Sequence, residues 1–410
     1  MPFFPAAPSR FPWVWHGESV RTGDMANVLL DQLTDYPFQR LTELLGGPAA
    51  ADSVVMSIGE PQHVPPPLLA RVLAENAPLW GKYPPAQGSA DFRGAVADWL
   101  TRRFALPAGM IEADRHILPV AGTREALYLM AQTVVTPSSQ RPLVLLPNPF
   151  YQVYVGAAVM AGAEPFYVPG AQGPASQPDY SALPDSVLAR VGLAYLCSPA
   201  NPQGSVADLD LLMRTIALAR RWNFVLAVDE CYSEIWDRDE PAGALTACSR
   251  LDGALDNVVV FHSLSKRSSV PGLRSGFVAG DGQVMAAFHR LRSYGGAVTP
   301  LPVLAAAAAL WRDEAHVEDN RRLYRAKLDI AERVLGVRVG FVRPAGGFFL
   351  WLDVGDGEKA AVELWRRAAI RVLPGRYLSR GEVGDRFIRV ALVHDLETTE
   401  AALTRLARTL

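Results

Sequence analysis

Residues 258–268 read Val-Val-Val-Phe-His-Ser-Leu-Ser-Lys-Arg-Ser. The run that ends at His262 predicts a buried strand, and the hydroxyl-rich turn after it carries Lys266. The chain then turns through 271–273, passes Arg274 and enters a second apolar run at 276–279. A strand, a lysine-bearing turn, an arginine and a second strand can hold a phosphate and a carbonyl group together.

Lys266 is one of four lysines among 40 basic residues, at a place where the chain otherwise favours arginine. A lysine amine can form an imine with an aldehyde, while Ser263, Ser265 and Arg274 can bind a phosphate dianion. This combination of groups fits pyridoxal phosphate. The alternative interpretation is that Lys266 belongs to an ordinary solvated loop.

The chain's length and composition set the broad class. Its 410 residues exceed one ordinary core and predict about two domains. The net charge of −2 gives no electrostatic reason to expect a nucleic acid or membrane partner. Three cysteines without disulfide or metal spacing, and no apolar run of membrane length, favour a cytoplasmic protein without a metal site. Residues 1–24 lack a signal-peptide pattern and are interpreted as a disordered leader, with Met25 as an alternative start.

Short apolar runs alternate with helix-length segments between about residues 115 and 280. The runs are 117–120, 143–146, 165–168, 193–197, 224–228, 258–262 and 276–279. Because continuous apolar runs are typical of strands buried on both faces, we expect an α/β domain with a mostly parallel seven-stranded sheet. Segments 123–134 and 209–222 have helical spacing. Ligands of such sheets bind at the carboxyl ends of the strands.

The C-terminal part has a different rhythm, which predicts a smaller α+β domain. A helical stretch at 303–334 leads to strand-like runs at 337–342, 347–353, 371–373 and 387–392, with further helices at 359–369 and 396–410. We expect segment 25–65 to join the small domain. The remaining boundaries are expected at 66–300 for the large domain and 301–410 for the small one.

Polar and aromatic residues follow several predicted strands. Thr123 begins a helix that could bind an anion, although many helices begin this way. Asp229 could keep a pyridine nitrogen protonated, ligate a metal or cap a helix, and Tyr232 could reach a ring hydroxyl. Asn201 could donate to a ligand oxygen or only shape a turn. Tyr151 could stack on a planar ring or belong to the core.

Arg389 stands alone in the apolar run at 387–392. An arginine in such a place usually pairs with a carboxylate, which belongs either to the protein or to a ligand. Its planar fork matches the α-carboxylate of an amino acid.

Taken in order, these residues resemble the class I/II pyridoxal-phosphate aminotransferases, which have fold type I. The shared motifs are the Gly122-Thr123 turn, the aromatic Tyr151, Asn201-Pro202-x-Gly204, Asp229-x-x-Tyr232, Ser263-x-Ser265-Lys266 with Arg274, and the late Arg389. Within this superfamily the chain is most similar to the N-succinyldiaminopimelate aminotransferases, through the runs at 36–41, 57–61, 122–127, 148–154, 229–235 and 263–280. Gln203 and His262 depart from the family pattern without removing a catalytic group.

The resemblance implies a role for each site residue. The implied catalytic residues are Lys266, Asp229 and Tyr232. The implied cofactor-binding residues are Tyr83, Gly122, Thr123, Arg124, Tyr151, Asn201, Asp229, Tyr232, Ser263, Ser265, Lys266 and Arg274. The implied substrate-binding residues are Gly59, Asn201 and Arg389. Tyr83 should reach the phosphate in the partner subunit's site, which implies a homodimer.

The resemblance also implies a ping-pong transamination in lysine biosynthesis. Glutamate would transfer its amino group to N-succinyl-2-amino-6-ketopimelate, giving 2-oxoglutarate and N-succinyl-LL-2,6-diaminopimelate, with Lys266 as the general base. The alternatives are the same chemistry on aspartate, alanine, aromatic amino acids or kynurenine, and a β-elimination lyase on the same fold. A non-catalytic regulator is disfavoured, because no basic segment of roughly 60 residues is left over for DNA binding.

Overall fold

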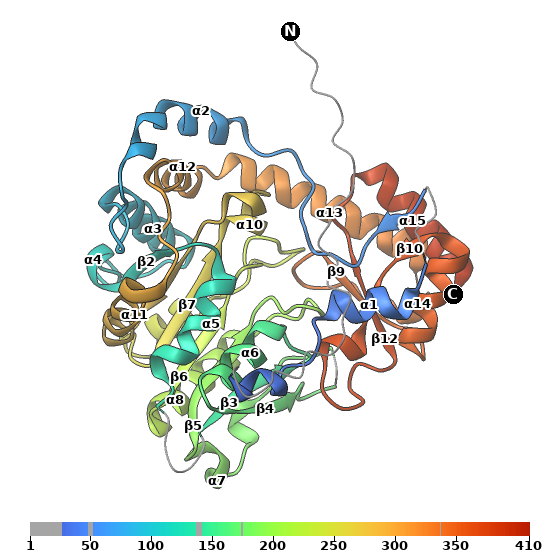
Figure 1. Ribbon diagram of the computed structural model, residues 1–410, viewed down its shortest axis with the longest axis horizontal. Helices are drawn as coiled ribbons and strands as arrows, with labels where there is room; N and C mark the ends of the chain where they lie inside the picture. Colours follow the sequence, from blue (N-terminus) through green and yellow to red (C-terminus); the bar gives the residue numbers. More distant parts are fainter. Residues whose placement is uncertain (1–26, 48–51, 137–141, 174, 337) are drawn as a thin grey trace.

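The structure is a computed structural model that describes residues 27–47, 52–136, 142–173, 175–336 and 338–410. The predicted leader, 1–24, lies outside the described residues. Figure 1 shows a larger part, built on a central sheet, and a smaller part in which the C-terminal segments surround the N-terminal helix α1 (Pro37–Leu45). In the described part of the chain, no helix is long and apolar enough to cross a membrane.

The larger part contains one seven-stranded sheet in the order β2-β8-β7-β6-β5-β3-β4. Its strands are β2 Ile117–Val120, β3 Leu143–Asn148, β4 Glu164–Pro169, β5 Val191–Cys197, β6 Val225–Asp229, β7 Val258–Ser263 and β8 Gly276–Gly280. Of these, β8 runs antiparallel to both neighbours, and the remaining pairs are parallel. The expected mostly parallel sheet is therefore confirmed, with strand ends within two residues of those predicted.

Helices cover both faces of this sheet. They are α2 Pro67–Glu75, α3 Ala90–Arg103, α4 Ala113–His116, α5 Thr123–Val134, α6 Gln152–Met160, α7 Asp185–Leu188, α8 Leu209–Trp222, α9 Ala244–Leu251, α10 Leu264–Arg267, α11 Gly282–Gly295 and α12 Leu301–Arg312. Alternate residues of a strand point to opposite faces. Leu143 and Leu145 thus join the core with α3, α8 and α12, while Val144 and Leu146 join the core with α5 and α6. This burial on both faces explains why the strands read as continuous apolar runs.

The smaller part is an α+β arrangement around its own core. Strands β9 (Phe349–Asp353), β11 (Leu373–Pro374) and β12 (Phe387–Ala391) form an antiparallel sheet in the order β11-β12-β9. Strand β1 (Val54–Val55) pairs in parallel with β10 (Ile370–Arg371). Helices α13 Ala315–Leu335, α14 Gly357–Ala368 and α15 Leu396–Thr409 complete it. Short 3-10 turns lie at Val28–Gln32, Ala77–Gly81, Tyr180–Ala182, Pro271–Leu273, Arg338–Gly340 and Gly375–Leu378.

Two local predictions were wrong. The expected helix 303–334 is two helices, because Asp313 is extended (φ −97°, ψ 120°) and ends α12 before α13 begins. The expected strand at 337–342 is not formed by its described residues: 338–340 make a 3-10 turn in which Val339 has φ 49°. Positive φ values at Gly336 and Gly340 also turn the chain on either side, so it cannot stay extended.

Helix α12 packs with the larger part. Its Leu304, Ala307 and Trp311 join the core beneath the seven-stranded sheet, whereas Leu328 and Ala331 of α13 join the core of the smaller part. The domain boundary at 300/301 stays a prediction.

Candidate active site

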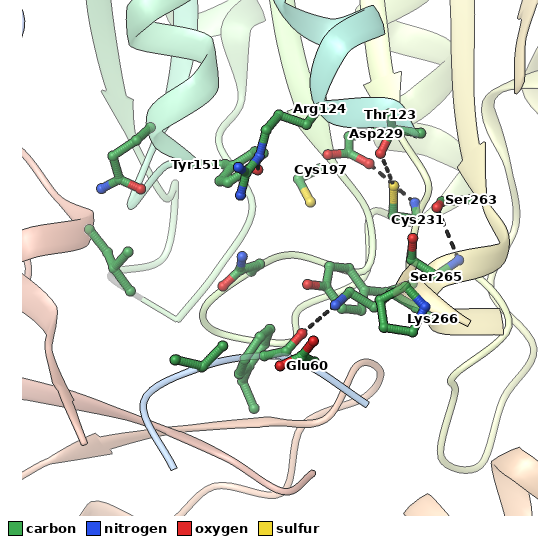
Figure 2. Close-up of a pocket in the computed structure, with 18 of the residues that line it drawn as sticks. Glu60, Thr123, Arg124, Tyr151, Cys197, Asp229, Cys231, Ser263, Ser265 and Lys266 are labelled. Atoms are coloured by element: carbon green, nitrogen blue, oxygen red, sulfur yellow. Dashed lines mark hydrogen bonds between the residues drawn. The ribbon is translucent and has the colours of Figure 1, made fainter. Parts of the chain in front are cut away.

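A cavity of about 460 Å³ lies where the carboxyl ends of the parallel strands face the smaller part. The predicted site residues that line it are Gly59, Thr123, Arg124, Tyr151, Asn201, Asp229, Tyr232, Ser263, Ser265, Lys266, Arg274 and Arg389. Of the predicted set, Gly122 is not among the lining residues, although it contacts Arg274, and Tyr83 lies elsewhere and is fully exposed. Figure 2 shows Lys266, Asp229 and Arg124 around this cavity.

Lys266 extends from α10, immediately after β7. Its amine donates a hydrogen bond to the backbone oxygen of Gly59, on a segment that crosses from the smaller part. No carboxylate in the described ranges forms an ion pair with it, and burial lowers its pKa from 10.5 to about 8. A lysine with a lowered pKa is partly neutral near physiological pH, so it can act as a nucleophile or a general base.

Asp229 is the last residue of β6, and its side chain is 5% exposed. Its carboxylate accepts hydrogen bonds from the Tyr154 hydroxyl at 2.7 Å and from the Cys231 backbone N–H at 3.2 Å. Burial raises its pKa. No cation among the described residues forms an ion pair with it, which leaves the carboxylate ready for a donor from a ligand.

Sequence reasoning did not assign Tyr154 to the site. It lies on α6, three residues after Tyr151, which is the N-cap of this helix. Their rings meet edge-on at 5.6 Å, and Tyr154 also stacks on Tyr195 at 4.5 Å. The i, i+3 spacing was the available signal, but it does not show which of the two tyrosines reaches Asp229.

An anion-binding corner lies between α5 and α10. Helix α5 begins at Thr123, and the N–H groups of its first turn have no partners within the helix. Gly122 has φ +86°, and a Cβ there would lie 2.1 Å from Arg274 Nη2. Arg274 donates to the backbone oxygens of Pro271 at 2.8 Å and Ala121 at 3.1 Å. Within the described ranges no carboxylate pairs with Arg274.

A second buried cation, Arg389 on β12, faces the cavity from the smaller part and is 5% exposed. It donates to Asn201 Oδ1 at 2.9 Å and to the backbone oxygen of Ser57 at 2.7 Å, and it lies over the Phe349 ring. Burial lowers its pKa to about 10. It forms no ion pair in the described part of the chain. A buried guanidinium held by neutral groups can accept a ligand carboxylate.

Several residues of the cavity wall beyond Tyr151 were not predicted from the sequence. The backbone of Arg124 was predicted to bind the cofactor phosphate, and this stays a prediction. The Arg124 side chain donates to the hydroxyl of Tyr151 at 2.9 Å and to that of Tyr36 at 3.4 Å. Tyr36 and Phe38 also line the cavity, and they lie in segment 16–40, which we expected from the sequence to shape the substrate pocket. Further lining residues that the sequence did not assign to the site include Glu60, Gln152, Cys197, Cys231 and Phe349.

The cavity fits pyridoxal phosphate because it presents three charged groups without ion-pair partners among the described residues. Asp229 matches a protonated pyridine nitrogen, Lys266 an aldehyde, and Arg274 a phosphate beside the start of α5. The fold and this site define the class as an enzyme of fold type I that uses pyridoxal phosphate.

Comparison with known proteins places the chain within that class. The family model for aminotransferase class I and II matches residues 51–406, so the chain belongs to this family and is a pyridoxal-phosphate-dependent aminotransferase. An aminotransferase structure from Neisseria meningitidis is 41% identical with a TM-score of 0.87, covering 93% of this chain and 99% of that one. The resemblance inferred from sequence is confirmed at this level.

Three other relatives carry more specific names. The LL-diaminopimelate aminotransferase of Dehalococcoides mccartyi is 29% identical over 92% of this chain and 97% of its own length. The 4-dedimethylamino-4-oxo-anhydrotetracycline transaminase OxyQ of Streptomyces rimosus is 32% identical, covering 92% and 99%. A structure of a probable N-succinyldiaminopimelate aminotransferase from Thermus thermophilus is 26% identical with a TM-score of 0.81, covering 91% and 100%.

Proposed function

We propose that this aminotransferase transfers an amino group between glutamate and N-succinyl-2-amino-6-ketopimelate, forming N-succinyl-LL-2,6-diaminopimelate in the lysine pathway. The observation that carries the proposal is the guanidinium of Arg124, which lines the cavity in addition to those of Arg274 and Arg389. Like Arg389, it has only neutral partners among the described residues. With Arg274 assigned to the phosphate, Arg124 and Arg389 are two guanidinium groups without a carboxylate partner in the described ranges, which favours a substrate with a carboxylate at each end.

We assign the roles of the residues near the cofactor from the resemblance to the family and from their places on the cavity wall. Pyridoxal phosphate, when bound, supplies an electron-accepting ring that stabilises negative charge at the α-carbon of an amino acid. Asp229 would hold a proton on the ring nitrogen, with Tyr232 and Asn201 at the ring hydroxyl and Tyr151 against the ring face. Thr123, Ser263, Ser265 and Arg274, with the backbone at Gly122 and Arg124, would bind the phosphate.

We assign the roles of the residues that face the substrate on the same basis. Arg389 binds the α-carboxylate, which orients the α-hydrogen, while the Gly59 backbone lies beside it. Lys266 takes the α-proton as general base, because burial lowers the pKa of its amine to about 8. Asn201 holds the Arg389 fork in place through its Oδ1.

A second candidate substrate is LL-diaminopimelate itself, the substrate that the name of the Dehalococcoides relative gives. The Glu60 side chain, which lines the cavity near Lys266, favours this alternative, because it could bind the free distal ammonium that succinylation removes (Figure 2). The two substrates differ at this group, so the same assay separates them.

A homodimer is the proposed assembly. Tyr83 is fully exposed, and Trp80, three residues earlier in the sequence, is also exposed. A tyrosine that reaches the phosphate in a partner subunit's site would have to lie free in a single chain. Sedimentation should give twice the chain mass, and Tyr83→Phe should weaken cofactor binding without dissociating the dimer.

The substrate proposal is tested by comparing kcat/KM for N-succinyl-LL-2,6-diaminopimelate, LL-diaminopimelate and alanine. We expect the succinylated substrate to be best, and Arg124→Gln to lower its kcat/KM roughly 10- to 100-fold, since one charged hydrogen bond contributes about 1.5–3 kcal/mol. The value for alanine, which has one carboxylate, should stay within about threefold. An equal loss for both substrates would contradict the role given to Arg124, and a preference for LL-diaminopimelate that Glu60→Gln removes would favour the second candidate.

A further inference from the structure

The C-terminal end of α10 is held by a side chain from another helix. Because α10 has four residues, the carbonyl groups of Lys266 and Arg267 have no partners within it. The amide nitrogen of Asn320, on α13, donates to these two oxygens at 3.0 Å and 3.1 Å. Asn320 is 6% exposed. The backbone that carries the proposed catalytic lysine is therefore fixed by a helix whose core lies in the smaller part.

A chain of polar contacts gives the Asn320 amide one orientation. Carbonyl oxygens only accept, so Nδ2 must face Lys266 and Oδ1 must face away. Asn320 Oδ1 lies 2.5 Å from His63 Nδ1 and accepts from the Ser269 hydroxyl at 3.0 Å. His63 Nδ1 must therefore carry the ring hydrogen. Its Nε2, 2.6 Å from Lys327 Nζ, is then the acceptor for the lysine.

The far end of this chain of contacts is a buried lysine. Lys327 is 1% exposed, and it forms no ion pair within the described ranges. It lies seven residues, or two helical turns, after Asn320, and therefore on the same face of α13. Burial lowers the pKa of Lys327 to about 7 and that of His63 to about 4, so His63 is neutral at pH 7. The Tyr324 ring packs against both of them, at 4.5 Å and 4.9 Å.

The segment that carries His63 also contacts the other end of the catalytic lysine. The backbone oxygen of Gly59, four residues earlier, accepts the hydrogen bond from the Lys266 amine. Lys266 is thus held at its backbone carbonyl by Asn320 and at its amine by Gly59.

We propose that Asn320 is a positioning residue for Lys266, and that His63 and Lys327 keep the Asn320 amide turned toward the lysine backbone. This inference rests on the role of Lys266 as general base and not on the identity of the substrate. If the Lys266 amine is displaced by a fraction of an ångström, the enzyme still binds its substrate, but proton transfer to the amine is slower.

The test uses the holoenzyme of Asn320→Ala and of His63→Phe, which keeps a ring against Tyr324 but has no nitrogen. With glutamate and α-deuterated glutamate, Asn320→Ala should lower kcat ~10- to 100-fold, change KM less than about threefold and raise the isotope effect. His63→Phe should give smaller changes in the same direction. The double variant should be no slower than Asn320→Ala, because both changes act through one amide. The pH midpoint of the cofactor absorbance should also shift in both variants.

Asn148→Ala is the matched control. Asn148 on β3 is also 6% exposed, and it joins the larger part to Arg380 by two hydrogen bonds of 2.9 Å and 3.0 Å. It should lower the melting temperature by a similar amount and leave the isotope effect and the absorbance midpoint unchanged. The proposal is overturned if Asn320→Ala and His63→Phe keep the wild-type isotope effect and the wild-type absorbance midpoint. It is also overturned if Asn148→Ala changes these two quantities as much as Asn320→Ala does. Should Asn320→Ala not fold, His63→Phe decides.

The assignment of glutamate as the amino donor is tested separately from the role of Asn320. Should the wild-type enzyme not accept glutamate, the proposed amino donor fails, and the absorbance midpoint still decides the positioning role. A shifted midpoint in His63→Phe supports the role in that case, and an unshifted midpoint overturns it.

Discussion

The two walls of the cavity are built in different ways. On one wall, Asn201, Asp229 and Lys266 each follow or end a strand of the large sheet, namely β5, β6 and β7. The opposite wall combines Gly59 from an N-terminal segment with Arg389 from β12. From the same side, Asn320 on α13 donates a hydrogen bond to the backbone oxygen of Lys266. The first wall holds the groups that suit the cofactor, and the second holds groups that suit the substrate and position the lysine.

The difference shows how local sequence relates to function. Residues at adjacent strand ends of a parallel sheet are brought together by the sheet itself, so a strand pattern already predicts their neighbourhood. The second wall exists only after three distant segments pack together. Lys266 belongs to the first wall but is held from the second, and the predictions below separate the two contributions.

The largest effect is expected for Lys266→Ala, which removes the group that both walls position. Turnover should fall at least ~10⁴-fold, because no other described amine lines the cavity to take the α-proton. The assay is exchange of the glutamate α-hydrogen in D₂O, followed by NMR. Asp229 and Arg274 are unchanged, so the variant should still bind the cofactor without a covalent bond. Exchange within about tenfold of the wild-type rate would contradict the role of Lys266 as base.

Asp229→Asn tests the first wall alone. Replacing the carboxylate removes the charge that keeps the ring nitrogen protonated, and we expect kcat to fall roughly 10²- to 10³-fold with KM little changed. Steady-state kinetics measure this loss. Asp252→Asn, which changes an exposed carboxylate paired with Arg220, is the control and should leave kcat and KM unchanged. A loss below about fivefold in Asp229→Asn would show that the carboxylate does not serve the ring.

The pH dependence of cofactor capture tests the burial of Lys266. The neutral amine attacks the aldehyde, and its pKa is lowered from 10.5 to about 8. Below pH 8 the amine is mostly protonated, so the rate at which the apoenzyme captures pyridoxal phosphate should rise about tenfold per pH unit and level off above pH 8. Stopped-flow absorbance from pH 6 to pH 10 follows this rate. A continued rise to pH 10 would indicate an ordinary exposed lysine.

Tyr154→Phe should give the smallest effect. It removes one hydrogen bond of 2.7 Å to Asp229 but leaves the ring stacked on Tyr195. One such bond to a charged group contributes about 1.5–3 kcal/mol, of which only the part that differs in the transition state affects rate, so kcat should fall about three- to tenfold. The measurement is kcat with glutamate. A loss as large as that of Asp229→Asn would make Tyr154 part of the catalytic group itself.

The sequence predicted best those features that depend on residues close together along the chain. All seven strands of the large sheet were predicted. In all but the edge strand β4, whose residues are mostly half-buried or exposed, burial on both faces leaves a continuous apolar run. The residues at β5, β6 and β7 were found for the same reason. The split between α12 and α13 was missed because it depends on the backbone of Asp313. Asn320, His63 and Lys327 carry no pattern, since they lie up to 264 positions apart and meet only in the packed structure.

The most direct test of the account is a half-reaction measured by absorbance. The holoenzyme is converted to its amine form with glutamate, freed of excess glutamate, and mixed with N-succinyl-2-amino-6-ketopimelate, oxaloacetate, pyruvate or phenylpyruvate. We expect the aldehyde-form absorbance to return much faster with the succinylated keto acid, because Arg124 and Arg389 would bind its two ends. No return with that keto acid, or a faster return with a simpler one, would contradict the proposed substrate.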